Sequence, residues 1–178
     1  MAKKIFPLEK VYTLLEPGAV AMVTTAFRGR LNVMTMSWHT MIDFNPPLVG
    51  LVIGDQSQTF RTVRKTGECV VNLPGVELLR KAVACGNVSG RDVDKFKAFG
   101  LTPVKASYVK APMVRECRVN LECRLVDQKL AVRYNFFIFK VLRAWIDPGK
   151  KDPKTFRHLG KGLFLVGGKK IQLPSRMK

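Results

Sequence analysis

The chain has 178 residues, 47% of them hydrophobic and 25% charged, which is enough to form a substantial core and excludes a disordered tail. Lysine and arginine total 31 against 13 acidic residues, so the formal net charge is +18 and the protein should attract polyanions. The N-terminal segment begins basic, but Glu9, Lys10, Glu16 and Pro17 interrupt the apolar core that a signal peptide needs. Because no apolar run approaches the length of a membrane span, we expect a soluble cytoplasmic protein with residues 1–178 in one domain.

The hydrophobic pattern predicts a mainly β chain with short helices. Strands are expected over residues 20–26, 31–38, 48–53, 69–73, 119–126, 132–146 and 163–166, and helices over 76–85 and 93–99. Gly29 marks a hairpin turn, and residues 147–153 read as a charged surface turn. Large apolar residues occur on both faces of segment 132–146, which indicates either a central strand or a dimer seam.

The strand expected over 31–38 has two mixed faces. Alternation places Leu31, Val33, Thr35 and Ser37 on one side and Asn32, Met34, Met36 and Trp38 on the other. Hydroxyls and backbone groups can bond the carbonyls and nitrogens of a flat heteroaromatic ring, while thioethers and an indole cover its apolar area. A partly exposed strand with core methionines fits the same pattern.

The helix that follows the apolar run 48–54 begins at Ser57 and ends at Gly67. A Ser or Thr at a helix start, free backbone N–H groups, and Arg61 and Arg64 in the first two turns would together seat a phosphate. Ser57 or Thr59 simply capping a surface helix is the alternative interpretation.

The motif SGRDVDKF occupies residues 89–96. It places Arg91 and Lys95 four apart on an expected helix, with Asp92 and Asp94 between them. A solvated helix start with salt bridges would account for this spacing without any ligand.

The cysteines and histidines give little indication of a function. Cys69, Cys85, Cys117 and Cys123 form no CxxC pair and have no histidine at zinc spacing, so reduced and mostly buried thiols are expected, with a redox role left open. His39 follows the mixed strand and is either near a ligand or an ordinary strand histidine, and His158 is expected in a loop.

Several ordered motifs together resemble the flavin reductase family of FMN-binding split barrels, near its flavoredoxin branch. They are NVMTMSW at 32–38, NPPLV at 45–49, SQT at 57–59, TG at 66–67, VNLP at 71–74, SGRDVDKF at 89–96, AP at 111–112 and NLEC at 120–123. The resemblance covers nearly the whole chain. It implies a split β-barrel, a homodimer with noncovalent FMN near the subunit interface, and NAD(P)H as a possible transient electron donor, and it favours a dimer seam for part of segment 132–146.

The residues and the resemblance together assign a cofactor site but no catalytic residue and no metal ligand. We expect the phosphate at Ser57, Thr59 and Arg61, and the ring along 32–38. The resemblance implies that Ser89, Arg91 and Lys95 contact the phosphate or the ring, from either subunit. The complete set is Asn32, Val33, Met34, Thr35, Met36, Ser37, Trp38, Ser57, Thr59, Arg61, Ser89, Arg91 and Lys95. Since the chain has no GxGxxG motif, a nicotinamide donor would lie transiently over the exposed flavin face.

The sequence is compatible with three functions. The first is an NAD(P)H-dependent flavoprotein reductase that passes electrons to ferric iron, free flavin or a redox protein. The second is an FMN-binding electron carrier or storage protein without turnover of its own. The third is a basic nucleic-acid-binding protein, although the basic residues are spread along the chain and match no nucleic-acid-binding motif. The basic segment 150–170 has no assigned role.

Overall fold

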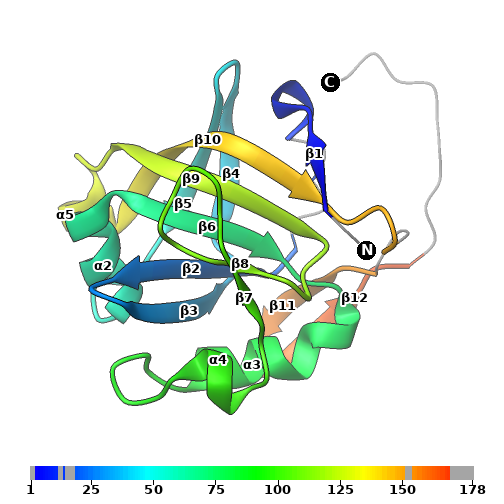
Figure 1. The fold of residues 1–178 in the computed structure, drawn as a ribbon. Helices are drawn as coiled ribbons and strands as arrows, with labels where there is room; N and C mark the ends of the chain where they lie inside the picture. The colour runs from blue at the N-terminus through cyan, green and yellow to red at the C-terminus, as the bar shows by residue number, and fades with distance from the viewer. Residues whose placement is uncertain (1–2, 12–13, 15–18, 151–153, 169–178) are drawn as a thin grey trace.

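The computed structural model describes residues 3–11, 14, 19–150 and 154–168, and its centre is a strongly curved sheet of eight strands (Figure 1). The order along the sheet is β3-β2-β6-β9-β10-β5-β4, and β1 pairs with β10. Neighbouring strands are antiparallel. The bounds are β1 Lys4–Phe6, β2 Ala21–Phe27, β3 Arg30–Met36, β4 His39–Phe44, β5 Pro47–Val52, β6 Glu68–Leu73, β9 Val119–Asp127 and β10 Phe136–Ile146. The sheet does not close, because β3 and β4 are its two edges, and the architecture is the expected split barrel.

Short helices and two small hairpins surround this sheet. They are η1 Leu8–Lys10, α2 Gln58–Thr66, η2 Val76–Leu78, α3 Leu79–Asn87, α4 Lys95–Ala98 and α5 Ala131–Tyr134, with β7 Pro103–Val104 paired to β8 Met113–Val114 and β11 Phe156–Gly160 paired to β12 Leu163–Val166. In Figure 1, α3 and α4 lie below β3, and α2 lies at the end of the barrel beside β2. None of the helices in the described part of the chain is long and apolar enough to cross a membrane.

Strand β3 is covered on both faces, which explains its mixed pattern. Met34 and Met36 pack with the barrel interior, where Phe60 of α2 meets Phe137 edge-to-face at 5.2 Å between ring centroids. Val33 packs instead in a second core beneath α3. Thr35 lies on this second side as well, and its hydroxyl donates to the carbonyl of Ala82 at 2.6 Å.

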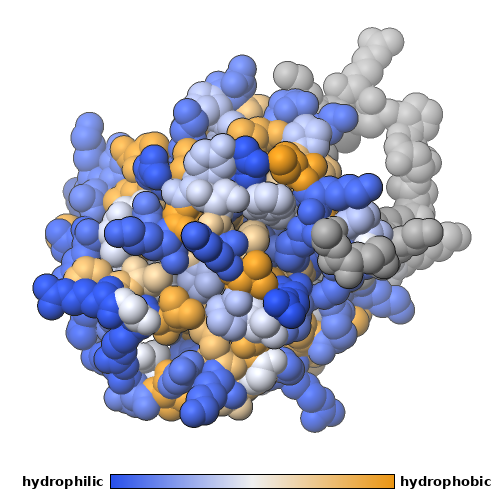
Figure 2. All heavy atoms as spheres, in the orientation of Figure 1, coloured by the Kyte–Doolittle hydropathy of each residue, from blue (hydrophilic) through white to orange (hydrophobic). Residues whose placement is uncertain are grey.

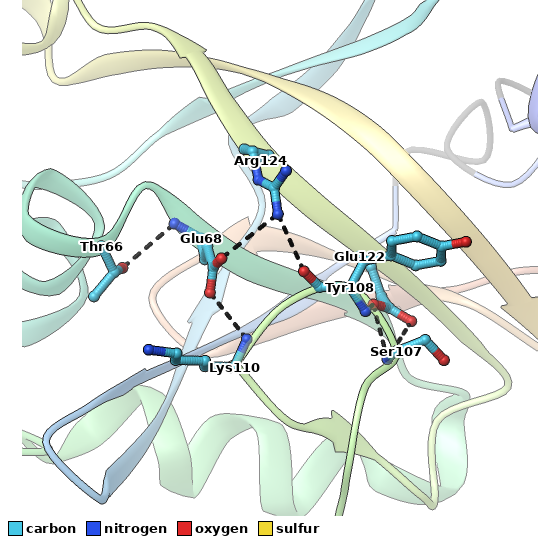
Figure 3. Close-up of polar contacts among 7 residues, drawn as sticks. All are labelled: Thr66, Glu68, Ser107, Tyr108, Lys110, Glu122 and Arg124. Atoms are coloured by element: carbon cyan, nitrogen blue, oxygen red, sulfur yellow. Dashed lines mark hydrogen bonds and ion pairs between the residues drawn. The ribbon is translucent and has the colours of Figure 1, made fainter.

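A strap formed by residues 105–112 crosses the outside of β6 and β9 (Figure 3). Glu122 of β9 is fully buried, and its carboxylate accepts hydrogen bonds from Ser107 N at 3.0 Å, Tyr108 N at 2.6 Å and Trp145 Nε1 at 2.7 Å. Glu68 of β6 accepts from Lys110 N at 2.9 Å. The strap is therefore held through its backbone N–H groups by two carboxylates of the sheet.

The predicted helix that starts at Ser57 is confirmed. Ser57 is the N-cap of α2, and its hydroxyl accepts from Phe60 N at 3.1 Å. Gly67 ends the helix in the left-handed conformation at φ 66°, where a residue with a Cβ would be strained.

The other predicted elements are confirmed in position, with corrections to their bounds. The strand expected over 132–146 begins only at Phe136, because residues 131–134 form α5 and Asn135 turns the chain with φ 58°. The helix expected over 93–99 is reduced to α4, and residues 76–78 of the next expected helix are 3-10. His158 is on β11, so its expected place in a loop is wrong. Strands β1, β4, β7, β8 and β11 were not predicted.

Strand β10 is a central strand, between β9 on one side and β5 and β1 on the other. Its two faces are apolar because they belong to two cores: Phe137, Phe139 and Val141 pack in the barrel interior, and Leu142 and Trp145 pack outside it against the strap. Glu16, Pro17 and residues 151–153 of the expected surface turn lie outside the described residues. On the face shown in Figure 2, hydrophilic residues are spread around separate hydrophobic patches.

The strap offers a test of the buried carboxylate. Glu122→Gln should lower the free energy of unfolding by about 3 kcal/mol, because the amide presents N–H groups where backbone and indole N–H donors already point. Urea unfolding measures the change. The isosteric Glu68→Gln is the control and should cost about 1 kcal/mol, since Glu68 is partly exposed. Equal losses in the two variants would contradict this account of the strap.

Candidate functional site

A cleft of about 510 Å³ lies between β3, the start of α2 and the segment that leads from α3 to α4. Its walls contain Asn32, Met34, Thr35, Gly54, Asp55, Gln56, Ser57, Gln58, Thr59, Cys85, Gly86, Val88, Ser89, Gly90, Arg91 and Lys95. Eight predicted site residues meet here: Asn32, Met34, Thr35, Ser57, Thr59, Ser89, Arg91 and Lys95. Residues from three separate parts of the sequence thus form one cavity.

The start of α2 forms one wall of the cleft. Its first turn carries no acidic residue, and Ser57 occupies only the N–H of Phe60. The N–H groups of Gln58 and Thr59 precede the first regular helical hydrogen bond, so this end of the helix is open to an anion. Asp55 also lines the cleft, on the exposed loop before the helix.

Asn32 joins this helix start to β3. Its amide nitrogen donates to the Thr59 hydroxyl at 2.9 Å, and both side chains are buried. Its Oδ1 atom is buried and has no hydrogen-bond partner in the described part of the chain. Gly90 lies directly against this amide, and a Cβ on Gly90 would overlap Oδ1. A buried polar atom without a partner, in the wall of a cavity, is one that a bound molecule can satisfy.

Lys95 places a positive charge in the same cleft. Only 4% of the residue is exposed, and Nζ donates to the carbonyl of Cys85 at 2.6 Å. Burial lowers the pKa of Lys95 below its ordinary value of 10.5. The ion pair found among the described residues joins Arg124 and Glu68. Lys95 therefore has no carboxylate partner among those residues.

The loop 89–91 brings Arg91 to the rim of the cleft. The Ser89 hydroxyl accepts from both the backbone N and the Nε of Arg91 at 3.2 Å, and Arg30 donates to the carbonyl of Arg91 at 3.2 Å. Arg91 precedes α4 and is not on a helix with Lys95, which corrects the predicted geometry. Asp94 caps α4 by accepting from Lys97 N at 3.2 Å, so the alternative of a salt-bridged helix start is also wrong among the described residues.

The structure does not bring the other predicted residues into the cleft. Val33 and Met36 are buried, Trp38 is 72% exposed, and Arg61 is exposed on α2. Ser37 lines a neighbouring hollow instead. Arg64 lies over the ring of Phe60, with its Cζ atom 5.9 Å from the centroid.

Sequence reasoning missed half of the cleft wall. Residues 54–56 directly precede the predicted helix start, so their position in the chain was a usable signal. Cys85, Gly86 and Val88 come from the end of α3, and no local motif marks them. They reach the cleft because α3 packs beneath β3.

All four cysteines are free and buried, as predicted. Burial raises the pKa of Cys85 to about 11, although Lys95 and Lys81 oppose the shift. Cys69 lies directly opposite Cys123 on neighbouring strands, a pairing that the sequence did not predict, and burial raises the pKa of Cys69 well above its ordinary value. The thiols of Cys69 and Cys85 are therefore protonated at neutral pH, which makes them poor nucleophiles.

His39 is outside the cleft. Its Nε2 atom lies 2.7 Å from the carbonyl oxygen of Ala19, so it bonds to the backbone as an ordinary strand histidine would. In the described residues, no three His, Cys, Asp or Glu side chains come together as a metal-ligand set.

Comparison with known proteins identifies relatives over most of the chain. A family model described as the flavin reductase like domain matches residues 14–163. The uncharacterized protein YddH of Escherichia coli is 31% identical over 172 residues, covering 89% of this chain and 91% of YddH. An uncharacterized protein of Archaeoglobus fulgidus is 35% identical over 123 residues, covering 69% of this chain and 70% of that protein.

Solved structures share the fold. The FMN-binding domain of a flavin reductases-like enzyme from Shewanella baltica matches with a TM-score of 0.90 at 24% identity, covering 97% of this chain and 98% of that one. Flavoredoxin from Methanosarcina acetivorans matches with a TM-score of 0.75 at 26% identity, covering 89% of both chains.

The cleft cysteine provides a test of the site. Iodoacetamide should modify Cys85 slowly in the native protein at about pH 8, and the rate should rise as the pH approaches 11, because thiolate forms only near the raised pKa. Mass spectrometry of timed samples measures the modification, and unfolded protein is the control. Rapid modification of native Cys85 at about pH 8 would contradict both its burial and its raised pKa.

Proposed function

The chain belongs to the flavin reductase like domain family, and from this premise we propose that it is an FMN-dependent oxidoreductase whose cofactor binds in the cleft beside β3. The observation that carries the proposal is the buried Lys95 in the cleft wall. A buried cation without a carboxylate partner is costly to the protein, and an anionic ligand offsets that cost.

The cleft fits the two chemical parts of FMN. For the phosphate it offers the open start of α2 with Ser57 and Thr59, the ammonium of Lys95 and the guanidinium of Arg91. For the ring it offers the side chains of Met34 and Thr35, and Asn32, whose Oδ1 has no partner among the described residues. Asn32 and Thr59, which are hydrogen-bonded to each other, join the two regions.

The named residues would bind and orient the cofactor. Bound FMN would supply the redox chemistry by accepting a hydride from a nicotinamide and passing electrons to an acceptor such as ferric iron, free flavin or a redox protein. NAD(P)H is the proposed donor and a homodimer is the proposed assembly. The similarity to flavoredoxin from Methanosarcina acetivorans supports a redox function.

The first test of this function is a visible absorption spectrum of protein purified through a high-salt wash. We expect a flavin spectrum with about one FMN per chain, released on denaturation and identified by chromatography. Anaerobic addition of NADH or NADPH should then bleach it. A colourless protein that takes up no added FMN, and that retains nucleic acid, would refute the proposal.

Lys95→Met should weaken FMN binding at least about tenfold at neutral pH, because the phosphate loses a buried, charge-assisted hydrogen bond. In the unmodified protein, affinity should fall as the pH rises through the lowered pKa of Lys95, since deprotonation removes the positive charge. The variant should lack this alkaline decrease. Fluorescence titration of the apoprotein with FMN measures both effects.

Lys97→Met is the matched control, because Lys97 is an exposed lysine on the same helix and does not line the cleft. It should retain both the affinity and its pH dependence. Equal losses in the two lysine variants would show that net charge, not the position of Lys95, governs FMN affinity.

A further inference from the structure

A second hollow of about 290 Å³ adjoins the cleft, between β3, α3 and the β11–β12 hairpin. We propose that it binds an uncharged, flat, conjugated carbonyl compound such as a quinone, as the electron acceptor of the enzyme. The proposal deepens the proposed function and rests on it. An acceptor of this class takes up two electrons and two protons to become a hydroquinone. The cofactor, reduced by the nicotinamide donor of the proposed function, would supply both electrons and one proton as a hydride, and water would supply the second proton.

Two aromatic rings of the hairpin form one wall of the hollow. Phe156 and Phe164 meet edge-to-face with centroids 6.0 Å apart, and Phe156 is almost fully buried. His158 lies against Phe164 with ring centroids 5.0 Å apart. The hairpin is fixed to the rest of the protein by backbone bonds, including Val20 N to the carbonyl of Phe156 at 3.0 Å. Such walls favour a flat ring.

The polar groups of the hollow are hydrogen-bonding groups. Ser37, Asn87 and the His158 imidazole line it, and none of the described residues that line it is a lysine, arginine, aspartate or glutamate. A carbonyl oxygen can accept hydrogen bonds from these groups. The diphosphate of a nicotinamide dinucleotide would find no cation there, and the volume suits one or two fused rings.

Thr35 and Gly86 line both the hollow and the cleft, so the two spaces are neighbours. A Cβ on Gly86 would lie 3.6 Å from the Cβ of Thr35, in ordinary van der Waals contact, so the two residues lie close together at this boundary. The Thr35 hydroxyl is held by the carbonyl of Ala82, which fixes that side chain at the junction. A ring in the hollow would therefore lie next to a ring bound along β3.

The test uses FMN-loaded protein and duroquinone, a fully substituted quinone that does not alkylate thiols. Val83→Phe fills the hollow from α3 without touching the cleft, and His158→Ala removes a wall and a hydrogen-bonding group. Val83→Phe should weaken duroquinone binding at least about tenfold with FMN content unchanged, and His158→Ala should weaken it several-fold. Leu159→Ala, on the same strand but outside the hollow, is the control and should match the unmodified protein.

The other outcomes decide against the proposal. Full FMN content with unchanged duroquinone binding in Val83→Phe would overturn it. Loss of FMN from Val83→Phe would show that the hollow holds part of the cofactor. Slower reduction by NADH with unaltered quinone binding would assign the hollow to the donor. An unmodified protein that binds no FMN would refute the proposed function itself, which separates the two failures.

Discussion

The double burial of β3 is the constraint on which the site depends. An edge strand of an open sheet ordinarily has one face in the core and one in solvent, but β3 packs on the barrel interior with one face and on α3 with the other. The helix cover brings the end of α3 and the loop before α4 to the strand. The cleft forms where this cover meets the start of α2.

The polar groups in the cleft wall lower the stability of the protein when no ligand is bound. Among the described residues, the buried Lys95 has a carbonyl as its hydrogen-bond partner and Asn32 has an unpaired amide oxygen. Such groups lose hydration without full compensation, and the loss is recovered when a ligand of matching charge and shape binds. The hydrophobic core must therefore supply the stability that the cleft does not.

The sequence predicted what local chemistry determines. Ser57 and Gly67 bound α2 because capping and left-handed conformations depend on a few neighbouring residues. The start of β10 after Asn135 and the first strand of the hairpin, β11, escaped prediction, since a positive φ at asparagine and a glycine-rich turn have several local solutions. Cys85 and Gly86 reach the cleft only through packing of α3 on β3, which no pattern along the chain encodes. The assignment of Lys95 to the site came from the family motif rather than from charge or periodicity.

The strap over β6 and β9 has a consequence for sequence tolerance. Glu122 and Glu68 hold it through the backbone N–H groups of Ser107, Tyr108 and Lys110, so those contacts do not depend on the side chains at these three positions. The buried Ala106, Val109 and Ala111 pack on the sheet, so substitutions can accumulate at the exposed positions of the strap as long as this packing and the two carboxylates persist. The same property makes this surface suitable for grafting a label or a tether without altering the barrel.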